Sequence, residues 1–207
     1  MRNHQIDNIR KLTDHRFLNM YALDVTYGEN QKGVYQVASR AKDVDKLKIR
    51  TRVNKPDGVL IYSVYGEKKD HIVLVRQYRY PIDDFIYEFP AGLIEEGEDF
   101  KEAGIRELKE ETGLTLSPIT PPEGYSRPFF TTIGMTDESC ATVFGYASGN
   151  PTEEFQEVAE DIRIVLADKA EVRRILKEEN IAIMTAYMLM HFLNSPDGEP
   201  FGFLGVK

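Results

Sequence analysis

Residues 92–114 read GLIEEGEDFKEAGIRELKEETGL, and this stretch decides the fold of the chain. Its apolar residues recur at helical spacing between charged ones, which predicts an amphipathic helix over residues 98–112. The predicted apolar face consists of Phe100, Ala103, Ile105 and Leu108. Gly113 follows the last helical residue, and glycine commonly ends a helix because it adopts the left-handed conformation readily.

Three glutamates gather near the end of this helix. Glu107, Glu110 and Glu111 share one helix face at about 100° per residue. Their mutual repulsion weakens the helix, as does negative charge in its last turn. A bound cation would offset both effects, and hard oxygen ligands at this density suit Mg²⁺ or Mn²⁺. The alternative is a solvated acidic face paired with nearby Lys and Arg.

The full spacing of the segment favours the metal site. The pattern Gly-x5-Glu-x7-Arg-Glu-U-x-Glu-Glu-x-Gly-U, with U an aliphatic residue, fits the chain from Gly92 to Leu114 at all nine specified positions. This pattern is the signature, or box, of the Nudix hydrolases, and the chain resembles that family closely. The run Glu88-Phe-Pro-Ala-Gly92 leads directly into the box, as it does in the ADP-ribose pyrophosphatase branch.

The resemblance implies a strand-loop-helix-loop site that holds Mg²⁺ or Mn²⁺. It assigns metal binding and catalysis to Glu107, Glu110 and Glu111, with the Ala91 carbonyl completing the ligand set. Four further residues are expected to support the site. Gly92 permits a close turn of the backbone, Glu98 and Arg106 form an orienting ion pair, and Gly113 ends the helix.

Other candidates lie outside the box. Residues 71–81 resemble the strand that precedes the box in ADP-ribose and nucleoside diphosphate sugar hydrolases. Because Arg binds phosphate bidentately, Arg76 and Arg79 are substrate-binding candidates, with a surface salt bridge as the alternative for either. Glu88 is a third candidate. Glu138 is a fourth, because Gly134-Met-Thr-Asp-Glu138 resembles the family's Gly-x-[Ser/Thr]-x-Glu loop, although Thr132-Ile133 stands where this branch usually has Ser-Pro.

A late acidic loop precedes another predicted strand. The run Glu160-Asp-Ile-Arg-Ile resembles the loop that supplies the family's last carboxylate. Glu160 is therefore predicted to bind metal or activate water, with Glu157 as the second choice. A solvated acidic loop is the alternative.

Composition limits the possible partners. The 207 residues are 42% hydrophobic and carry a formal net charge of -8, without a Lys/Arg stripe. A protein that tracks nucleic-acid phosphates usually has a basic face, so no nucleic-acid partner is expected. Cys140 is the only cysteine, no apolar run approaches the roughly 20 residues of a membrane span, and no secretory signal is visible. We expect a cytoplasmic protein with no membrane partner.

The pattern of β-formers and turns predicts the remaining elements. Strands are expected over residues 17–27, 33–40, 58–66, 71–78, 84–89, 139–147 and 160–166, and helices over 168–178 and 180–193. Residues 1–15 are predicted to be a short helix or a loose arm, and 117–128 a long loop.

The resemblance implies an α/β fold, the Nudix α/β/α sandwich, with a mixed central sheet and an N-terminal β-hairpin extension. Residues 1–50 correspond to that extension and are expected to form a homodimer. Residues 51–195 correspond to the Nudix hydrolase domain. Residues 196–207 are a tail whose aromatic residues are expected to dock.

The implied reaction is metal-dependent hydrolysis of the pyrophosphate bond in ADP-ribose or a related nucleoside diphosphate sugar. The products would be a nucleoside monophosphate and a sugar phosphate. One alternative is a binding module that senses a nucleotide sugar without cleaving it. Another is an acidic dimeric scaffold.

Overall fold

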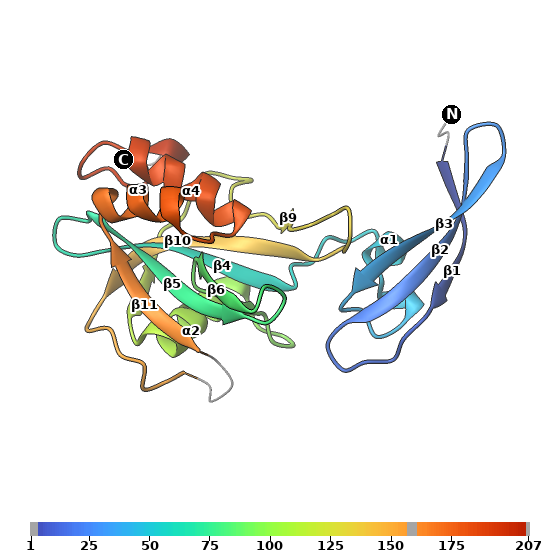
Figure 1. The fold of residues 1–207 in the computed structure, drawn as a ribbon, viewed down its shortest axis with the longest axis horizontal. Helices are drawn as coiled ribbons and strands as arrows, with labels where there is room; N and C mark the ends of the chain where they lie inside the picture. Colours follow the sequence, from blue (N-terminus) through green and yellow to red (C-terminus); the bar gives the residue numbers. More distant parts are fainter. Residues whose placement is uncertain (1–3, 157–160, 206–207) are drawn as a thin grey trace. The chain divides into compact units, whose positions relative to one another are not determined.

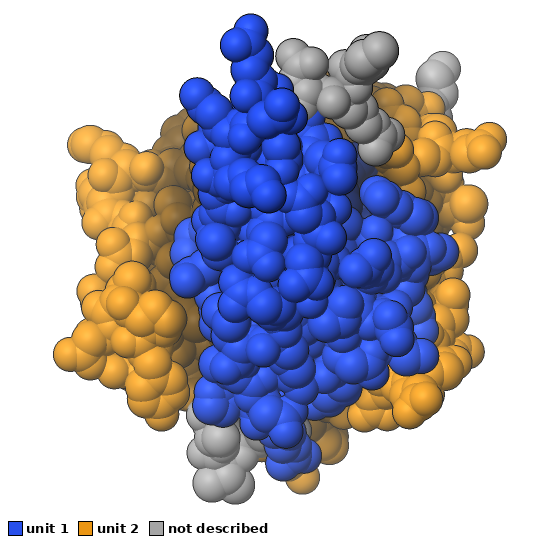
Figure 2. Space-filling view, turned by 90° about the vertical axis from the view of Figure 1, so that its right-hand side faces the viewer, with its two compact units in different colours: residues 1–57, 128–140 blue, residues 58–127, 141–207 orange. Residues whose placement is uncertain are grey.

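The computed structural model describes residues 4–156 and 161–205 of the chain. These form two compact units, coloured separately in Figure 2. Unit 1 consists of residues 1–57 together with 128–140, and unit 2 of residues 58–127 together with 141–207. The chain therefore passes from unit 1 to unit 2, returns for a short segment, and passes to unit 2 again.

Unit 1 contains a three-stranded antiparallel sheet in the order β1-β2-β3. Its elements are β1 (His4–Lys11), β2 (Asn19–Tyr27), β3 (Gln31–Ser39), the 3-10 helix η1 (Val44–Lys46) and α1 (Lys48–Thr51). The predicted hairpin is present as β2 and β3. The helix or arm predicted for residues 1–15 is wrong over 4–11, because this segment pairs with β2 and buries Ile9 in the unit's core.

The segment 128–140 completes unit 1. It contains β9 (Phe129–Phe130), which pairs with the first residues of β10 (Ser139–Ser148). The amide of Ala38 donates to the Met135 carbonyl at 2.9 Å, and the Tyr35 hydroxyl donates to the Gly134 carbonyl at 2.5 Å. Backbone and side-chain hydrogen bonds thus connect this segment to β3.

Unit 2 is built on a mixed sheet whose main strand order is β11-β5-β4-β10-β8, with β6 paired to β5 and β7 paired to β4 (Figure 1). Its strands besides β10 are β4 (Gly58–Tyr65), β5 (His71–Arg79), β6 (Asp84–Glu88), β7 (Ala91–Leu93), β8 (Thr115–Pro118) and β11 (Ile162–Ala167). Its helices are α2 (Phe100–Thr112), α3 (Lys169–Glu178), α4 (Ile183–Asn194) and the short η2 (Gly202–Leu204).

Helices cover both faces of this sheet. Val59 and Ile61 of β4 face a core cluster that includes residues of α2, whereas Tyr62 and Val64 face a cluster that includes residues of α3 and α4. This alternation follows from the two-residue period of a strand. It confirms the predicted α/β/α sandwich, with α2 on one face and α3 and α4 on the other (Figure 1).

The predicted strands and helices of unit 2 are present, with boundaries shifted by a few residues. The tail docks as expected, because Phe201 and Leu204 are each only 3% exposed in the α3–α4 cluster. The loop predicted for residues 117–128 begins inside β8. Among the described residues, no helix combines the length and apolar character that a membrane crossing requires.

Candidate functional site

The box helix α2 is fixed at both ends. At its start, the Asp99 carboxylate accepts a hydrogen bond from the Lys101 amide at 2.9 Å. At its end, Gly113 adopts the left-handed conformation with φ 72°, and its amide donates to the Lys109 carbonyl. A Cβ at residue 113 would lie 2.3 Å from Thr152 Cγ2, so only glycine fits without displacement.

One face of α2 packs on the sheet and includes a carboxylate. Ala103 and Leu108 are buried as predicted, but Ile105 is 39% exposed and does not belong to the core. At about 100° per residue, Ile105 lies at the margin of the buried face, whereas Glu111 lies near its centre. Glu111 is accordingly only 3% exposed, and its Oε2 accepts a hydrogen bond from the Ala91 amide at 3.2 Å.

Arg106 connects three carboxylates of the box. Its Nε and Nη2 donate to Glu98 at 2.9 and 3.0 Å, and its Nη1 donates to Glu107 and Glu110, both at 2.9 Å. A further bond from Nη2 reaches the Leu93 carbonyl. The guanidinium and, secondarily, the Glu95 amide lower the pKa of Glu98 below its ordinary value, because both stabilise the carboxylate.

Glu107 lies against the backbone of β7. A Cβ built on Gly92 would fall 1.9 Å from Glu107 Cδ and 2.0 and 2.2 Å from its two oxygens. Gly92 and Ala91 pair with Val59 and Leu60 of β4, so the sheet fixes the position of this backbone. The glycine therefore leaves a space beside the sheet that the Glu107 carboxylate fills.

The donor set fits a hard dication. The group contains four carboxylates, those of Glu98, Glu107, Glu110 and Glu111, and one guanidinium, so negative charge is in excess within it. Carboxylate oxygens beside a backbone carbonyl are the ligands that Mg²⁺ and Mn²⁺ prefer. Within residues 4–156 and 161–205, however, no three acidic, imidazole or thiol groups converge on one point, and Arg106 bridges Glu107 and Glu110.

The two arginine candidates lie on opposite faces of the sheet. Along β5, Val73 packs in the cluster on the α2 side and Leu74 in the α3–α4 cluster. By the two-residue period of a strand, Arg79 therefore faces the α2 side and Arg76 the other side. Arg79 Nε donates to Glu88 Oε2 at 2.7 Å. The Arg76 guanidinium instead stacks over the Phe85 ring, 4.4 Å from its centroid.

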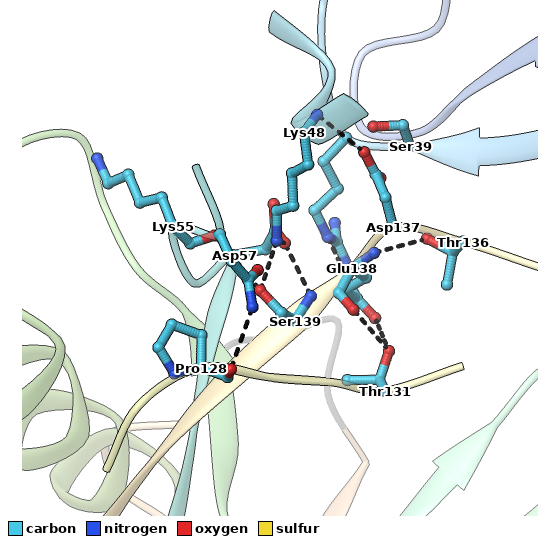
Figure 3. Close-up of polar contacts among 12 residues, drawn as sticks. Ser39, Lys48, Lys55, Asp57, Pro128, Thr131, Thr136, Asp137, Glu138 and Ser139 are labelled. Carbon is cyan, nitrogen blue, oxygen red and sulfur yellow. Dashed lines mark hydrogen bonds and ion pairs between the residues drawn. The ribbon is translucent and has the colours of Figure 1, made fainter. Parts of the chain in front are cut away.

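Glu138 belongs to unit 1. Its carboxylate accepts a hydrogen bond from Arg40 Nε at 2.7 Å. It also accepts one from the Thr131 hydroxyl at 3.3 Å (Figure 3). Next to it, Lys48 Nζ contacts both Asp57 Oδ2 and Ser139 Oγ, at 2.6 and 2.5 Å. This polar cluster fixes Glu138 within unit 1.

Two candidates, Glu157 and Glu160, lie outside the described residues. Two contacts to candidate residues were missed from the sequence. The side-chain amide of Gln156 donates to the Glu111 carbonyl at 2.8 Å, and Arg40 pairs with Glu138. Neither contact has a local signal, because each joins segments that are distant in the sequence.

The family follows from comparison with known proteins. The model of the NUDIX domain matches residues 54–187, more than half of the chain, and the chain belongs to the Nudix family. A putative nudix hydrolase 2 of Caenorhabditis elegans is 38% identical over 120 residues, which cover 55% of this chain and 52% of the relative. An ADP-ribose pyrophosphatase of Bacillus subtilis is 36% identical over 116 residues, which cover 56% of this chain and 59% of the relative.

The chain thus spans little more than half the length of these curated relatives. A solved structure extends the likeness of the fold to nearly the whole chain. The crystal structure of an ADP compounds hydrolase superposes with a TM-score of 0.66 at 19% identity, and the match covers 92% of this chain and 93% of the other.

Proposed function

We propose that this protein is a divalent-metal-dependent hydrolase that cleaves the pyrophosphate bond of ADP-ribose or a related nucleoside diphosphate sugar. One observation carries the proposal: Glu98, Glu107 and Glu110 pair with Arg106, and Glu107 lies against Gly92, where the sheet fixes the backbone. The name of the Bacillus subtilis relative supports the choice of substrate. The proposal also includes that the protein acts in the cytoplasm on a small-molecule nucleotide and has no nucleic-acid or membrane partner.

The metal would be held by Glu107, Glu110, Glu111 and the Ala91 carbonyl, with Glu160 from the late loop. When bound, Mg²⁺ or Mn²⁺ supplies Lewis-acid stabilisation of the diphosphate charge and lowers the pKa of the attacking water. Because Glu107 and Glu110 are now paired with Arg106, they must rotate away from it to take part. Glu98 keeps Arg106 in place during this exchange through its two bonds.

The chain's own residues account for the remaining steps. A glutamate of the box or Glu160 accepts the proton of the attacking water as a general base. The water oxygen bonds to phosphorus, and the bond to the bridging oxygen breaks with its electron pair leaving on the departing phosphate. Arg79 lies on the α2 side of the sheet, and it would exchange Glu88 for a phosphate of the substrate by bidentate hydrogen bonding. Glu138 would contact the terminal ribose.

The proposal includes a homodimer formed through the N-terminal region. Apolar side chains of unit 1 support it, since Ile6, Val34 and Tyr35 are exposed around a cavity of about 520 Å³ in the three-stranded sheet. Light scattering coupled to size-exclusion chromatography tests this part. A monomer at micromolar concentration would contradict it.

The decisive experiment is a substrate panel. Purified protein is incubated with ADP-ribose and other nucleoside diphosphate sugars, with and without Mg²⁺, and released phosphomonoester is measured. Metal-dependent release from at least one compound is expected. Saturable binding without turnover would favour the nucleotide-sugar sensor instead. A Glu111→Gln variant that keeps all function of the wild-type protein would favour the acidic scaffold.

A further inference from the structure

A second cavity lies within unit 2, away from the box. It has a volume of about 460 Å³, within the range of small-molecule sites, about 300–1,000 Å³. Three segments line it: the turn between β4 and β5, the start of α3, and the tail that follows α4. Figure 1 shows these segments gathered at one end of the sheet.

The box lies toward the other end of the same strand. Ala91 pairs with Leu60, near the beginning of β4, whereas Lys68 follows the end of that strand at Tyr65. At about 3.3 Å per residue, the five residues from Leu60 to Tyr65 alone separate the two places by about 16 Å. A ligand in this cavity would therefore not compete for the metal site.

The acidic groups of the cavity are already engaged. Asp70 pairs with His71 at 2.8 Å, and Asp197 pairs with Lys169 at 2.9 Å. The Asp168 carboxylate caps α3 by accepting the amides of Ala170 and Glu171. All three carboxylates keep their negative charge, and the lining has one cation more than it has carboxylates, since it contains Lys68, Lys69, Lys169 and Arg173.

Three cations of the cavity form no close ion pair with a carboxylate among the residues that the structure describes, although Arg173 still feels the charge of Asp168. Lys68 makes no ion pair, Lys69 lies over the Tyr146 ring, and Arg173 donates only to the Lys169 carbonyl. The lining is therefore net positive by one charge, on a chain with a net charge of -8. An anionic ligand would give these three cations a close ion-pair partner.

Apart from Ser195, the rest of the lining is apolar. This apolar part lies beside the three cations and includes Phe192, Pro196 and Pro200. A ligand that satisfies both parts carries a compact anionic group and an organic portion. A phosphomonoester fits best, because its charge of about -1.5 to -2 and three acceptor oxygens match one guanidinium and two ammonium groups.

We propose that this cavity is a second binding site, for a small soluble phosphomonoester whose phosphate contacts Lys68, Lys69 and Arg173. The site does not depend on the proposed hydrolase activity. Calorimetric titration of the full chain in EDTA tests it, with inorganic phosphate, ribose 5-phosphate and AMP as probes. Saturable binding of at least one probe is expected, and the double variant Lys69→Gln/Arg173→Gln should weaken it at least tenfold.

Two controls separate this cavity from other phosphate sites. Lys177→Gln removes an exposed charge from the same helix outside the cavity, and Arg79→Ala removes the candidate arginine on the α2 side. Both variants should bind like wild type, and melting curves confirm that all variants are folded. Binding that is lost in Arg79→Ala but kept in the double variant would overturn the proposal.

Two other outcomes would also overturn it. One is the absence of saturable binding for all three probes at millimolar concentration. The other is sedimentation with phosphatidic acid vesicles without binding of any soluble probe, which would point to a lipid headgroup. A tungstate soak gives an independent readout, since the proposal requires an anomalous peak between Lys69 and Arg173.

Discussion

The carboxylate of Glu107 lies directly against the Cα of Gly92. A methyl group at residue 92 would fall within 2.2 Å of the carboxylate carbon and both oxygens, so the two cannot coexist unchanged. We expect Gly92→Ala to displace Glu107 and to lower kcat/KM about 100-fold, because misplacement of a catalytic group by about 1 Å costs that much. Steady-state kinetics with ADP-ribose and Mg²⁺ measures the effect.

Gly202→Ala is the matched control. A Cβ there meets its nearest neighbour, Glu199, at 3.8 Å, which is an ordinary contact. This variant should retain wild-type kcat/KM. Full activity in Gly92→Ala would show that the position of Glu107 does not matter for catalysis.

Metal binding should be visible as thermal stabilisation. A dication that binds the folded chain raises its melting temperature as its concentration exceeds the dissociation constant. We expect Mg²⁺ or Mn²⁺ to raise the melting temperature of wild type, and Glu111→Gln to abolish most of this rise and to lower kcat by about 10²–10⁴-fold. Glu102→Gln, at an exposed position of the same helix, should behave like wild type. Equal stabilisation of Glu111→Gln would contradict the ligand role.

The ion pair between Glu98 and Arg106 should make stability depend on pH. The folded-state pKa of Glu98 lies below its ordinary value of 4.5, so the folded chain binds fewer protons than the unfolded chain. The stabilisation is therefore present above pH 4.5 and is lost as the pH falls through the lowered pKa. Since the pair is partly exposed, we expect Glu98→Gln to cost about 1 kcal/mol at neutral pH.

Urea unfolding at several pH values checks this expectation. The difference in unfolding free energy between wild type and Glu98→Gln should shrink as the pH is lowered below 4.5. A difference that stays constant over that range would mean that the carboxylate charge is not its source.

Arg76 and Arg79 lie on opposite faces of the sheet, so we expect their variants to affect different properties, stability for Arg76 and KM for Arg79. Arg79→Ala should raise KM at least tenfold, because the guanidinium on the α2 side loses its hydrogen bonds to phosphate. Arg76→Ala should leave KM unchanged and cost about 0.5–1 kcal/mol of stability, because it loses the stacking on Phe85 and the longer contact with the Tyr87 ring. Kinetics and urea unfolding of both variants separate the two roles, and a raised KM in Arg76→Ala alone would reverse the assignment.

The parts of the fold with local signals could be predicted from the sequence. The box helix has its cap, its apolar period and its terminal glycine within one stretch, so its extent was predicted to within two residues. β1 was missed because His4–Lys11 contains only two apolar residues, and a shift in register between Ile6 and Asn8 breaks the strand's alternation. The placement of Ile105 was wrong because the apolar spacing alone does not locate the edge of a buried face.

The contacts of the candidate site were harder to predict. The pairing of Glu98 with Arg106 joins two residues of one motif, and the family pattern implied it. Arg40 and Glu138 are 98 residues apart, and no periodicity connects them. The bond between Gln156 and the Glu111 backbone is of the same kind. Such contacts depend on how the folded chain brings distant segments together.

The return of residues 128–140 to unit 1 limits how the chain can be divided. Because three covalent connections join the units, no single cut releases either of them with all its parts. Removal of residues 1–57 would leave the Ser139 amide without the Asp57 carboxylate and Glu138 without Arg40. The N-terminal region is therefore not an independent module, and a chain re-engineered there must keep residues 128–140 matched to it.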